Sequence, residues 1–350
     1  MKLWTRRSLL KHAGTLAAAL ALAPFTNLGY LFADEAADAQ PMDADQPPAP
    51  LGRITTWRLA IREAPRRNAK LVRYAYNDEV LALLAQALGD PLLPHNPVWY
   101  KVEEGWLHSS FVQPVRQDFQ VPEPALASQG FWAQVTVPFT EARAQPSPHA
   151  RRVRRLYYTS VYRVSEAAIG EDGQWWYRIG HGLVWSNAGP YVPASHLRRI
   201  PPEELMPVHP EVLPDQKRIE VDLRRQIVTA YEGDRVVLTA RAATGFGRFQ
   251  TPRGQHRIIR KRMSSRMIGG EGRDFYDLPG VPFPAYFTAT AVAFHGAYWH
   301  NDFGRQRSHG CVNLPAPVAQ WIWRWTLPPM GYNEIEIRRN DPYATRVIVF

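Results

Sequence analysis

An internal duplication constrains the fold of this 350-residue chain more than any other feature of its sequence. The segments APRRNAKLVRYAYNDEVLAL and VWYKVEEGWLHSSFVQPV recur, loosely, as QPSPHARRVRRLYYTSVYRV and WWYRIGHGLVWSNAGPYVPASHLRRI. Each copy has a proline near its start, a basic segment, a short alternating stretch and a Trp-Tyr-basic-aliphatic stretch. Short strands with turn residues between them predict a small β-barrel for each copy.

The two copies resemble tandem bacterial SH3-like domains, which often accompany enzymes of the cell wall. We therefore predict SH3-like domain 1 over residues 53–117 and SH3-like domain 2 over residues 130–201. Two roles stay open for them. They either bind the wall through an exposed aromatic groove or act as a spacer that positions the next domain.

The N-terminal segment MKLWTRRSLLKHAGTLAAALALAPF has a basic start and an apolar run of about a dozen residues, too short to span a bilayer comfortably. The order TRRSLLK resembles a twin-arginine export signal. We predict an export signal over 1–39, with cleavage after Ala33 or Ala39, and a proline-rich linker over 40–52. The folded part is then expected in the cell wall or periplasm, or anchored to the membrane if the signal is not cleaved.

The chain carries a formal net charge of +10 and a single cysteine. An exported basic protein meets anionic wall polymers and lipid headgroups, so we predict wall polymers rather than nucleic acid as partners. A solvated basic surface without a specific partner is the alternative. One cysteine forms no intramolecular disulfide, so core burial must stabilise the fold. Retention of an unpaired thiol in an oxidising compartment favours a reactive role for it.

The hydrophobic pattern of the sequence changes at residue 215. The stretch RIEVDLRRQIVTAYEGDRVVLTARAATG alternates apolar and polar residues and predicts three strands. We predict a β-rich domain over 215–350. Gly245 and Gly247 do not indicate a phosphate loop, because no strand-to-helix context follows. The later segment PAPVAQWIWRW predicts a helix that Asn313 or Leu314 caps. Its apolar face is expected to contain Val318, Trp321, Ile322 and Trp325.

The lone thiol, Cys311, lies in the stretch RSHGCVNL. A thiol of ordinary pKa needs a base or a positive field to become a nucleophile. His309, two residues earlier, projects to the same side in extended backbone, and His295 precedes the cysteine by 16 residues. Together with the positive end of the following helix, these histidines are expected to lower the thiol pKa by more than about one unit. The amides of Gly310 and Cys311 are candidates for an oxyanion hole.

Two other interpretations of these residues remain. A histidine near a cysteine can be incidental. Zinc is the second, since His295, His300, His309 and Cys311 could fill four positions, but the paired ligand spacing of structural zinc sites is absent. We predict no metal and no cofactor.

The run HGAYWHNDFGRQRSHGCVNL, residues 295–314, resembles the active-site signature of L,D-transpeptidases of the YkuD type. The upstream stretches VDLRRQIVTAYEGDRVV, ATGF and TPRG match the same family in the right order. Two features depart from the pattern: Asn313 stands where many members have arginine, and PPMGYNEIEIRRNDPYA looks like an insertion before the last strand.

The resemblance implies a mainly β chain, with two small SH3-like barrels followed by a β-rich L,D-transpeptidase catalytic domain that has a helix after the cysteine loop. It implies a cysteine acyltransferase that acts on peptidoglycan stem peptides. Cys311 would attack a tetrapeptide stem, release the terminal D-alanine and form a thioester that a neighbouring amine resolves. The resemblance also implies site roles: His295 as base oriented by the Gly296 carbonyl, His309 in loop support or proton transfer, Asn313 and Tyr276 in substrate contact, Tyr298 and Trp299 as a groove wall, and Ser308 as a loop hydrogen-bonder.

Three rival functions are compatible with parts of the sequence. An L,D-carboxypeptidase would hydrolyse the same thioester with water. A papain-like endopeptidase places its cysteine before its histidine, whereas His295 precedes Cys311 here. A non-catalytic wall-binding protein would not need the intact set of His295, His309, Gly310 and Cys311.

Overall fold

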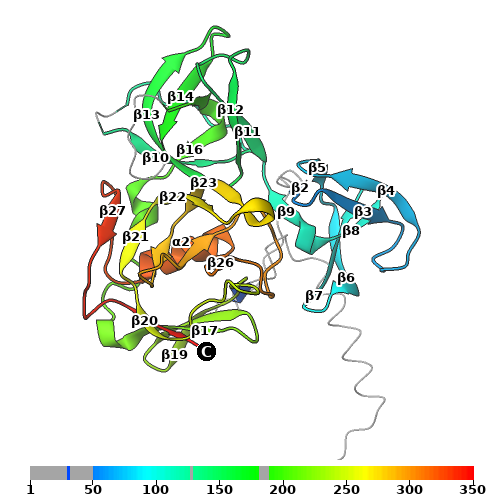
Figure 1. The fold of residues 1–350 in the computed structure, drawn as a ribbon. Helices are drawn as coiled ribbons and strands as arrows, with labels where there is room; N and C mark the ends of the chain where they lie inside the picture. Colours follow the sequence, from blue (N-terminus) through cyan, green and yellow to red (C-terminus); the bar gives the residue numbers. More distant parts are fainter. Residues whose placement is uncertain (1–29, 32–49, 127–128, 181–188) are drawn as a thin grey trace, which may run out of the picture. The chain divides into compact units, whose positions relative to one another are not determined.

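The structure, a computed structural model, describes residues 30–31, 50–126, 129–180 and 189–350 (Figure 1). Within these ranges the chain is mainly β, with one α-helix, α2 (Ala316–Trp325). No helix there is both long and apolar enough to cross a membrane. The predicted export signal and most of the predicted linker lie outside the described residues, apart from the two-residue strand β1 (Tyr30–Leu31).

The chain divides into two compact units, and the described part of the first is residues 50–114. Its strands form a three-stranded sheet of order β5-β2-β9 and a five-stranded sheet of order β4-β3-β8-β7-β6. The apolar core between them consists of residues of this unit, including Ile61, Val102 and Leu107. The strands are β2 (Leu51–Ile54), β3 (Arg58–Arg62), β4 (Leu71–Tyr76), β5 (Val80–Ala82), β6 (Ala85–Leu93), β7 (Asn96–Val102), β8 (Gly105–His108) and β9 (Val112–Val115).

The second copy of the duplication folds into one seven-stranded sheet of order β12-β11-β15-β14-β13-β10-β16. Neither copy closes into a barrel among the described residues, so the expected barrels are not seen and the SH3-like assignment stays a prediction. The strands are β10 (Phe131–Val135), β11 (Phe139–Arg143), β12 (Arg152–Tyr157), β13 (Val161–Ile169), β14 (Trp175–Gly180), β15 (Tyr191–Pro193) and β16 (Leu197–Arg199).

We call the copies repeat 1 (51–115) and repeat 2 (131–200). Their first hairpins share one register: Arg58 pairs with Tyr76 in repeat 1, and Phe139 pairs with Tyr157 in repeat 2. The offset is 81 positions, from Tyr76 to Tyr157. Side-chain and turn details recur at the same offset, namely the 2.7 Å bonds from Arg62 to the Ala69 carbonyl and from Arg143 to the Ala150 carbonyl, and the positive φ of Asp78 and Thr159.

The remaining residues of the second unit form two further sheets and a hairpin. A six-stranded sheet has the order β1-β19-β18-β17-β28-β20, and a five-stranded sheet has the order β26-β25-β24-β21-β27. The strands are β17 (Lys217–Asp222), β18 (Ile227–Glu232), β19 (Arg235–Arg241), β20 (Gly254–Arg257), β21 (Arg260–Arg262), β24 (Ala285–Tyr286), β25 (Ala293–Gly296), β26 (Val312–Leu314), β27 (Glu336–Arg338) and β28 (Arg346–Val349), with the hairpin β22 (Ser264–Gly269) and β23 (Tyr276–Pro282).

Helix α2 packs against β25 and anchors the core of this region. Its N-cap is Pro315, because Asn313 and Leu314 belong to β26, so the predicted cap at Asn313 or Leu314 is wrong. Val318, Ile322 and Trp325 are buried as predicted, whereas Trp321 is only half-buried and Trp323 takes its place in the core.

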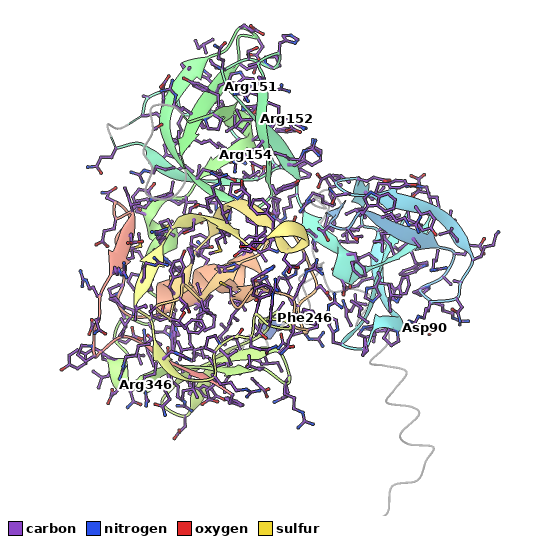
Figure 2. All side chains as sticks on the ribbon, viewed as in Figure 1. Asp90, Arg151, Arg152, Arg154, Phe246 and Arg346 are labelled. Carbon is purple, nitrogen blue, oxygen red and sulfur yellow. The ribbon has the colours of Figure 1, made fainter. Side chains whose placement is uncertain are left out.

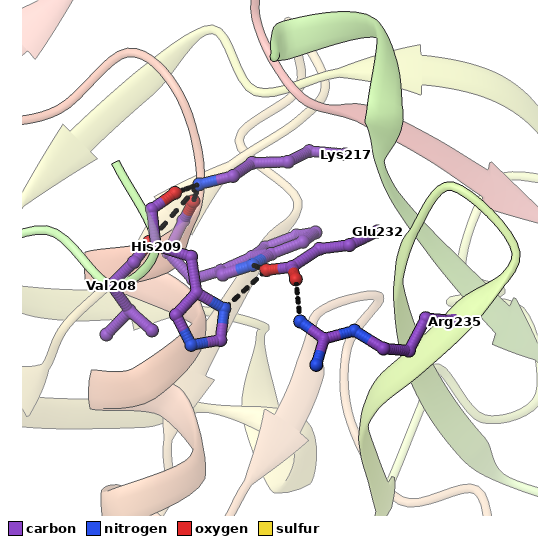
Figure 3. A network of polar contacts seen from close by, with 6 residues as sticks. Val208, His209, Lys217, Glu232 and Arg235 are labelled. Carbon is purple, nitrogen blue, oxygen red and sulfur yellow. Dashed lines mark hydrogen bonds and ion pairs between the residues drawn. The ribbon is translucent and has the colours of Figure 1, made fainter. Parts of the chain in front are cut away.

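Two buried lysines satisfy carbonyls at the C-terminal end of α2, which a helix leaves without intrahelical partners. Lys217 Nζ donates to the carbonyl of Trp325 at 3.2 Å and to that of His209 at 2.7 Å (Figure 3). Lys261 Nζ donates to the Trp323 carbonyl at 2.7 Å and also to the Thr326 carbonyl. Burial lowers the pKa of both lysines, Lys261 well below its ordinary value.

Glu232 links the same helix end to the six-stranded sheet. Its carboxylate accepts from Trp325 Nε1 at 2.8 Å and from Arg235 at 2.6 Å (Figure 3). The helix is therefore held at its C-terminal end, and its N-terminal end follows the strand beside the candidate site.

Repeat 2 and the region after it share one apolar core. Trp132, Val161 and Ile200 of repeat 2 lie in the same buried cluster as Val318 and Ile322 of α2. The Trp132 ring nitrogen also donates to the Tyr332 carbonyl at 3.1 Å. Repeat 2 additionally keeps a core of its own around Val135, Leu156 and Ile179.

Candidate active site

A parallel strand pair brings Cys311 and His295 together. Strand β25 pairs with β26, with His295 opposite Asn313, and Cys311 directly precedes β26. Side chains alternate along a strand, so the paired residues Asn313 and His295 project from the same face, and Cys311 lies at a bend two residues before Asn313. With a rise of about 3.3 Å per residue and strands about 4.8 Å apart, the diagonal Cα atoms of His295 and Cys311 lie about 8 Å apart, within reach of an imidazole and a thiol.

His295 is buried, and its Nδ1 lies 3.1 Å from the Gly296 carbonyl oxygen. A carbonyl only accepts, so Nδ1 carries the proton and Nε2 is the free acceptor. Burial lowers the pKa of this imidazole to about 4, and the bond to Gly296 opposes that shift more weakly. The ring is therefore neutral at pH 7, which is the form a general base requires.

The Cys311 thiol is half-buried and contacts the Ala291 carbonyl, with 3.9 Å between sulfur and oxygen. Burial raises the pKa of this thiol to about 11, and a backbone hydrogen bond at Ala293 opposes the shift more weakly. The expected lowering of the thiol pKa is therefore wrong. The neutral His295 supplies no positive field, and α2 begins at Ala316, beyond the intervening strand β26. The resting thiol keeps its proton at neutral pH.

His309 does not share the direction of Cys311, because Gly310 between them has a φ of 116° and the chain is not extended there. The exposed His309 ring lies against Phe249, with 4.4 Å between centroids, and against Tyr276, at 4.9 Å. This packing is that of a surface aromatic cluster around the cysteine loop. It favours loop support over proton transfer for His309.

Hydrogen bonds inside the cysteine loop fix its shape. Ser308 Oγ donates to the Cys311 carbonyl, and the Gly310 amide donates to Ser308 Oγ at 3.1 Å. Thr251 Oγ1 donates to the Gly310 carbonyl at 2.7 Å and accepts from the Gly245 amide at 2.9 Å. The Gly310 amide is thus engaged, and it would have to leave Ser308 to serve an oxyanion.

Thr251 is a loop-fixing residue to which sequence reasoning gave no role. The signal was present, because Thr251 opens the stretch TPRG, one of the stretches that match the family pattern. Its side chain is buried and joins that turn to the cysteine loop.

Tyr276 and Tyr286 lie within electrostatic range of the thiol. Burial raises the pKa of Tyr276, and the negative charge of a Cys311 thiolate raises it further. The same charge acts on Tyr286, whose pKa burial raises and whose hydroxyl is 3.0 Å from Ser265 Oγ. Tyr276 was predicted as a substrate contact, whereas nothing in the sequence pointed to Tyr286.

Asn313 is buried and its side-chain amide lies 3.0 Å from His300 Nε2. His300 Nδ1 accepts from the Asp302 amide at 3.2 Å, and burial lowers the His300 pKa well below its ordinary value. The neutral ring therefore carries its proton on Nε2. The nearest Asn313 atom is the amide nitrogen Nδ2, so the Asn313 amide must be turned over for its oxygen to accept that proton. Asn313, expected to contact substrate, instead holds the loop that connects His295 to Cys311.

Tyr298, expected to line the groove, is buried with its hydroxyl donating to the Pro279 carbonyl at 2.6 Å. The half-buried Trp299 lies closer to the site, with its ring centroid 5.7 Å from that of His295. Gly296 leaves no room for a side chain, because a Cβ there would come within 2.7 Å of Pro282 Cγ. Across the described ranges, no group of three or more His, Cys, Asp or Glu residues is arranged to hold a metal ion.

Comparisons with known proteins bear on this region. Residues 216–349 match the family model of the L,D-transpeptidase catalytic domain, YkuD. A candidate L,D-transpeptidase, YkuD of Bacillus licheniformis, is 29% identical over 109 residues, which are 30% of this chain and 56% of that relative. The chain thus spans about half the length of the curated relative it matches.

Solved L,D-transpeptidases show a weak overall likeness. One from Xylanimonas cellulosilytica is 27% identical, with coverage of 38% of this chain and 60% of that one and a TM-score of 0.28. One from Enterococcus faecium is 24% identical, with coverage of 39% and 50% and a TM-score of 0.31. One from Mycobacterium smegmatis is 17% identical, with coverage of 54% and 99% and a TM-score of 0.33.

Proposed function

We propose that the L,D-transpeptidase catalytic domain at residues 216–349 makes this chain an acyltransferase that cross-links peptidoglycan stem peptides. One observation carries the proposal: a lone thiol, Cys311, directly precedes the strand that pairs with the strand of a neutral histidine, His295, whose Nδ1 donates to the Gly296 carbonyl. This is the arrangement of a nucleophile with an oriented base.

The first half-reaction forms a thioester. Sulfur attacks the L-centred carbonyl of the third stem residue while His295 Nε2 takes the thiol proton. Attack and proton transfer are concerted, because the thiol holds its proton at rest. The resulting oxyanion is stabilised by the Cys311 amide. When the intermediate collapses, the histidinium gives its proton to the departing amine of D-alanine.

The second half-reaction transfers the acyl group. An amine of a neighbouring stem attacks the thioester carbonyl and gives a proton to His295. The carbon–sulfur bond breaks, and the sulfur takes the proton back from the imidazolium. The products are a cross-linked dimer and the starting enzyme.

Aromatic residues that are exposed or half-buried around the cysteine loop suit a peptide backbone and its side chains. Tyr276 and His309 border the cysteine loop, and Phe246, labelled in Figure 2, is 64% exposed on the neighbouring loop. The predicted substrate contact at Tyr276 fits this placement. Ser308 and Gly310 keep the loop in shape, and Asn313 and Tyr298 support it from the interior.

The remaining regions fit delivery to the wall. The N-terminal segment is assigned as an export signal, and the repeats as SH3-like modules that meet anionic wall polymers. Arg151 precedes β12 of repeat 2, and Arg152 and Arg154 lie in it (Figure 2); Arg151 and Arg152 are exposed.

The test incubates the purified chain with tetrapeptide stems and weighs the products. Dimers that have lost one D-alanine support transfer, and tripeptide alone indicates an L,D-carboxypeptidase. Cys311→Ala and His295→Ala should abolish both products, whereas His309→Phe, which keeps the ring packing, should retain activity within about tenfold. Full activity of Cys311→Ala would rule out the proposal. Binding of wall material without any turnover would indicate a non-catalytic wall-binding protein.

A further inference from the structure

We propose that Tyr157 of repeat 2 is a positioning residue for His295, acting through Tyr298 and Trp299. Repeat 2 would then be part of the active site rather than a spacer. This inference rests on the proposed function, because it assigns His295 the role of base.

Three aromatic contacts link repeat 2 to the catalytic histidine. Tyr157, the last residue of β12, stacks on Tyr298 with 5.6 Å between centroids and 22° between planes. Tyr298 meets Trp299 edge to face at 5.1 Å. Trp299 in turn lies 5.7 Å from His295. Each distance falls in the range of favourable ring pairs, so a shift of one ring displaces the next.

A second contact fixes the same interface. Tyr162 of repeat 2 and Tyr298 both donate hydrogen bonds to the Pro279 carbonyl, at 3.3 Å and 2.6 Å. Gly280 follows, with a φ of 66°, and a Cβ there would lie 2.4 Å from the Tyr162 ring. Both residues lie in β23, the strand that begins with Tyr276 beside the thiol. Repeat 2 therefore fixes the positions of Tyr298 and of strand β23 relative to each other.

The position of Trp299 matters because the neutrality of His295 depends on its burial. The titratable groups near the imidazole are Cys311, directly before β26, and His300, in the loop after β25. Tyr276 and Tyr286 face the thiol from β23 and β24. If Trp299 moves away, water reaches the ring and its pKa rises toward the ordinary value of about 6.5.

The duplication supplies a matched control. Tyr76 occupies the register position of Tyr157 in repeat 1, where it is 52% exposed. Its ring lies 6.3 Å from that of Trp57, which is 73% exposed. Replacing Tyr76 removes the same side chain from the same hairpin without touching the aromatic series that leads to His295.

The experiment uses the full chain and follows acylation of Cys311 by a carbapenem, with intact mass as the readout, from about pH 4 to about pH 8. Carbapenem acylation needs the thiol and its base but no peptidoglycan. Turnover of tetrapeptide stems is measured in parallel. Failure of the proposed function then appears only in the stem assay, and failure of this inference appears in the acylation profile.

In Tyr157→Ala, acylation should slow by about 10- to 100-fold, and the acid limb of its pH profile should move from about 4 toward about 6.5. Tyr157→Phe keeps the stacked ring and should restore both rate and profile to within about threefold. Tyr76→Ala should match the parent chain. If Tyr157→Ala does not fold, Tyr157→Leu, which fills the same space without the aromatic face, should show the same direction of change. An unchanged rate and acid limb in a folded Tyr157→Ala or Tyr157→Leu chain would overturn the proposal.

Discussion

Repeat 1 and repeat 2 place a tyrosine at the same position of the same hairpin, and the two tyrosines meet different surroundings. Tyr157 stacks on Tyr298, which lies in residues 216–349, the stretch that matches the L,D-transpeptidase catalytic domain model and is called the catalytic region below. Tyr76 stays exposed beside Trp57. The cores differ in the same way. The core of repeat 1 is built from its own residues, whereas Trp132 and other residues of repeat 2 enter the core of the catalytic region.

The difference shows that two copies of a duplicated segment can keep the same backbone hydrogen bonds while their side chains take different roles. Both repeats keep the hairpin register and the arginine-to-carbonyl bond near its turn. In this register the tyrosine side chain points away from the core of its own repeat. It can then either bind an external partner or pack on the next domain. Repeat 2 packs, and repeat 1 keeps an exposed aromatic surface.

The largest expected effect comes from emptying the shared core. Trp132→Ala should cost about 3–5 kcal/mol and unfold repeat 2 together with the catalytic region, because Trp132 is buried in their common cluster. The matched variant Trp99→Ala removes a buried tryptophan from repeat 1 and should leave acylation of Cys311 intact. Thermal unfolding followed by residual acylation checks both. Equal loss of acylation in the two variants would contradict the claim that only repeat 2 shares a core with the catalytic region.

The acid sensitivity of the second unit gives the next effect. Folded His295 has a pKa of about 4, so the unfolded chain takes up the proton first, near about pH 6.5. The stability contribution is fully present above about pH 6.5 and is lost as the pH falls toward about 4, by up to about 3 kcal/mol.

Denaturant titrations at several pH values measure this loss. His295→Gln, which has no titrating group, should lower the slope of stability against pH in this range, and the buried, neutral His300 should account for the slope that remains. A parent-like slope in His295→Gln would place the acid sensitivity elsewhere.

Crowding at the contact between repeat 2 and β23 should give a smaller effect. Gly280→Ala forces a Cβ against Tyr162 at a positive φ and should cost about 2–3 kcal/mol. Gly173→Ala, at a positive φ with open space around it, should cost only about 1 kcal/mol. Chemical denaturation measures both, and equal costs would show that Tyr162 yields easily.

The smallest expected effect is at the exposed aromatic pair of repeat 1. Trp57→Ala should change stability by no more than about 0.5 kcal/mol, since the ring is largely in water. It should leave carbapenem acylation unchanged but lower the fraction of the chain that sediments with purified wall sacculi. Unchanged sedimentation would favour a spacer role for repeat 1.

The sequence predicted the elements whose patterns are local. The alternating strands after residue 215, the helix after the cysteine loop and the doubled hairpins all follow from period and turn residues. The hydrogen bond from His295 to the Gly296 carbonyl was anticipated from the family resemblance and is present. The catalytic roles of His295 and Cys311 stay predictions.

The errors arose where contacts between residues far apart in the sequence determine the position and the pKa of a side chain. The thiol pKa was expected to fall, but burial of Cys311 raises it. The histidine expected to supply positive charge, His295, is neutral, and the helix end is separated from the thiol by β26. Asn313 was expected to contact substrate and Tyr298 to form a wall of the groove, whereas both side chains are buried, Asn313 beside His300 and Tyr298 with its hydroxyl on the Pro279 carbonyl. No local pattern reveals such partners.

The protonated state of the lone sulfur has a consequence for its resistance to oxidants. Oxidants such as peroxide attack the anion of cysteine, and a pKa of about 11 leaves about one molecule in ten thousand in that form at pH 7. A cysteine of ordinary pKa, about 8.5, has about three hundredfold more thiolate at that pH. A protonated thiol reacts when a substrate carbonyl lies beside the imidazole that takes its proton. Oxidation of the sulfur between turnovers is correspondingly slow.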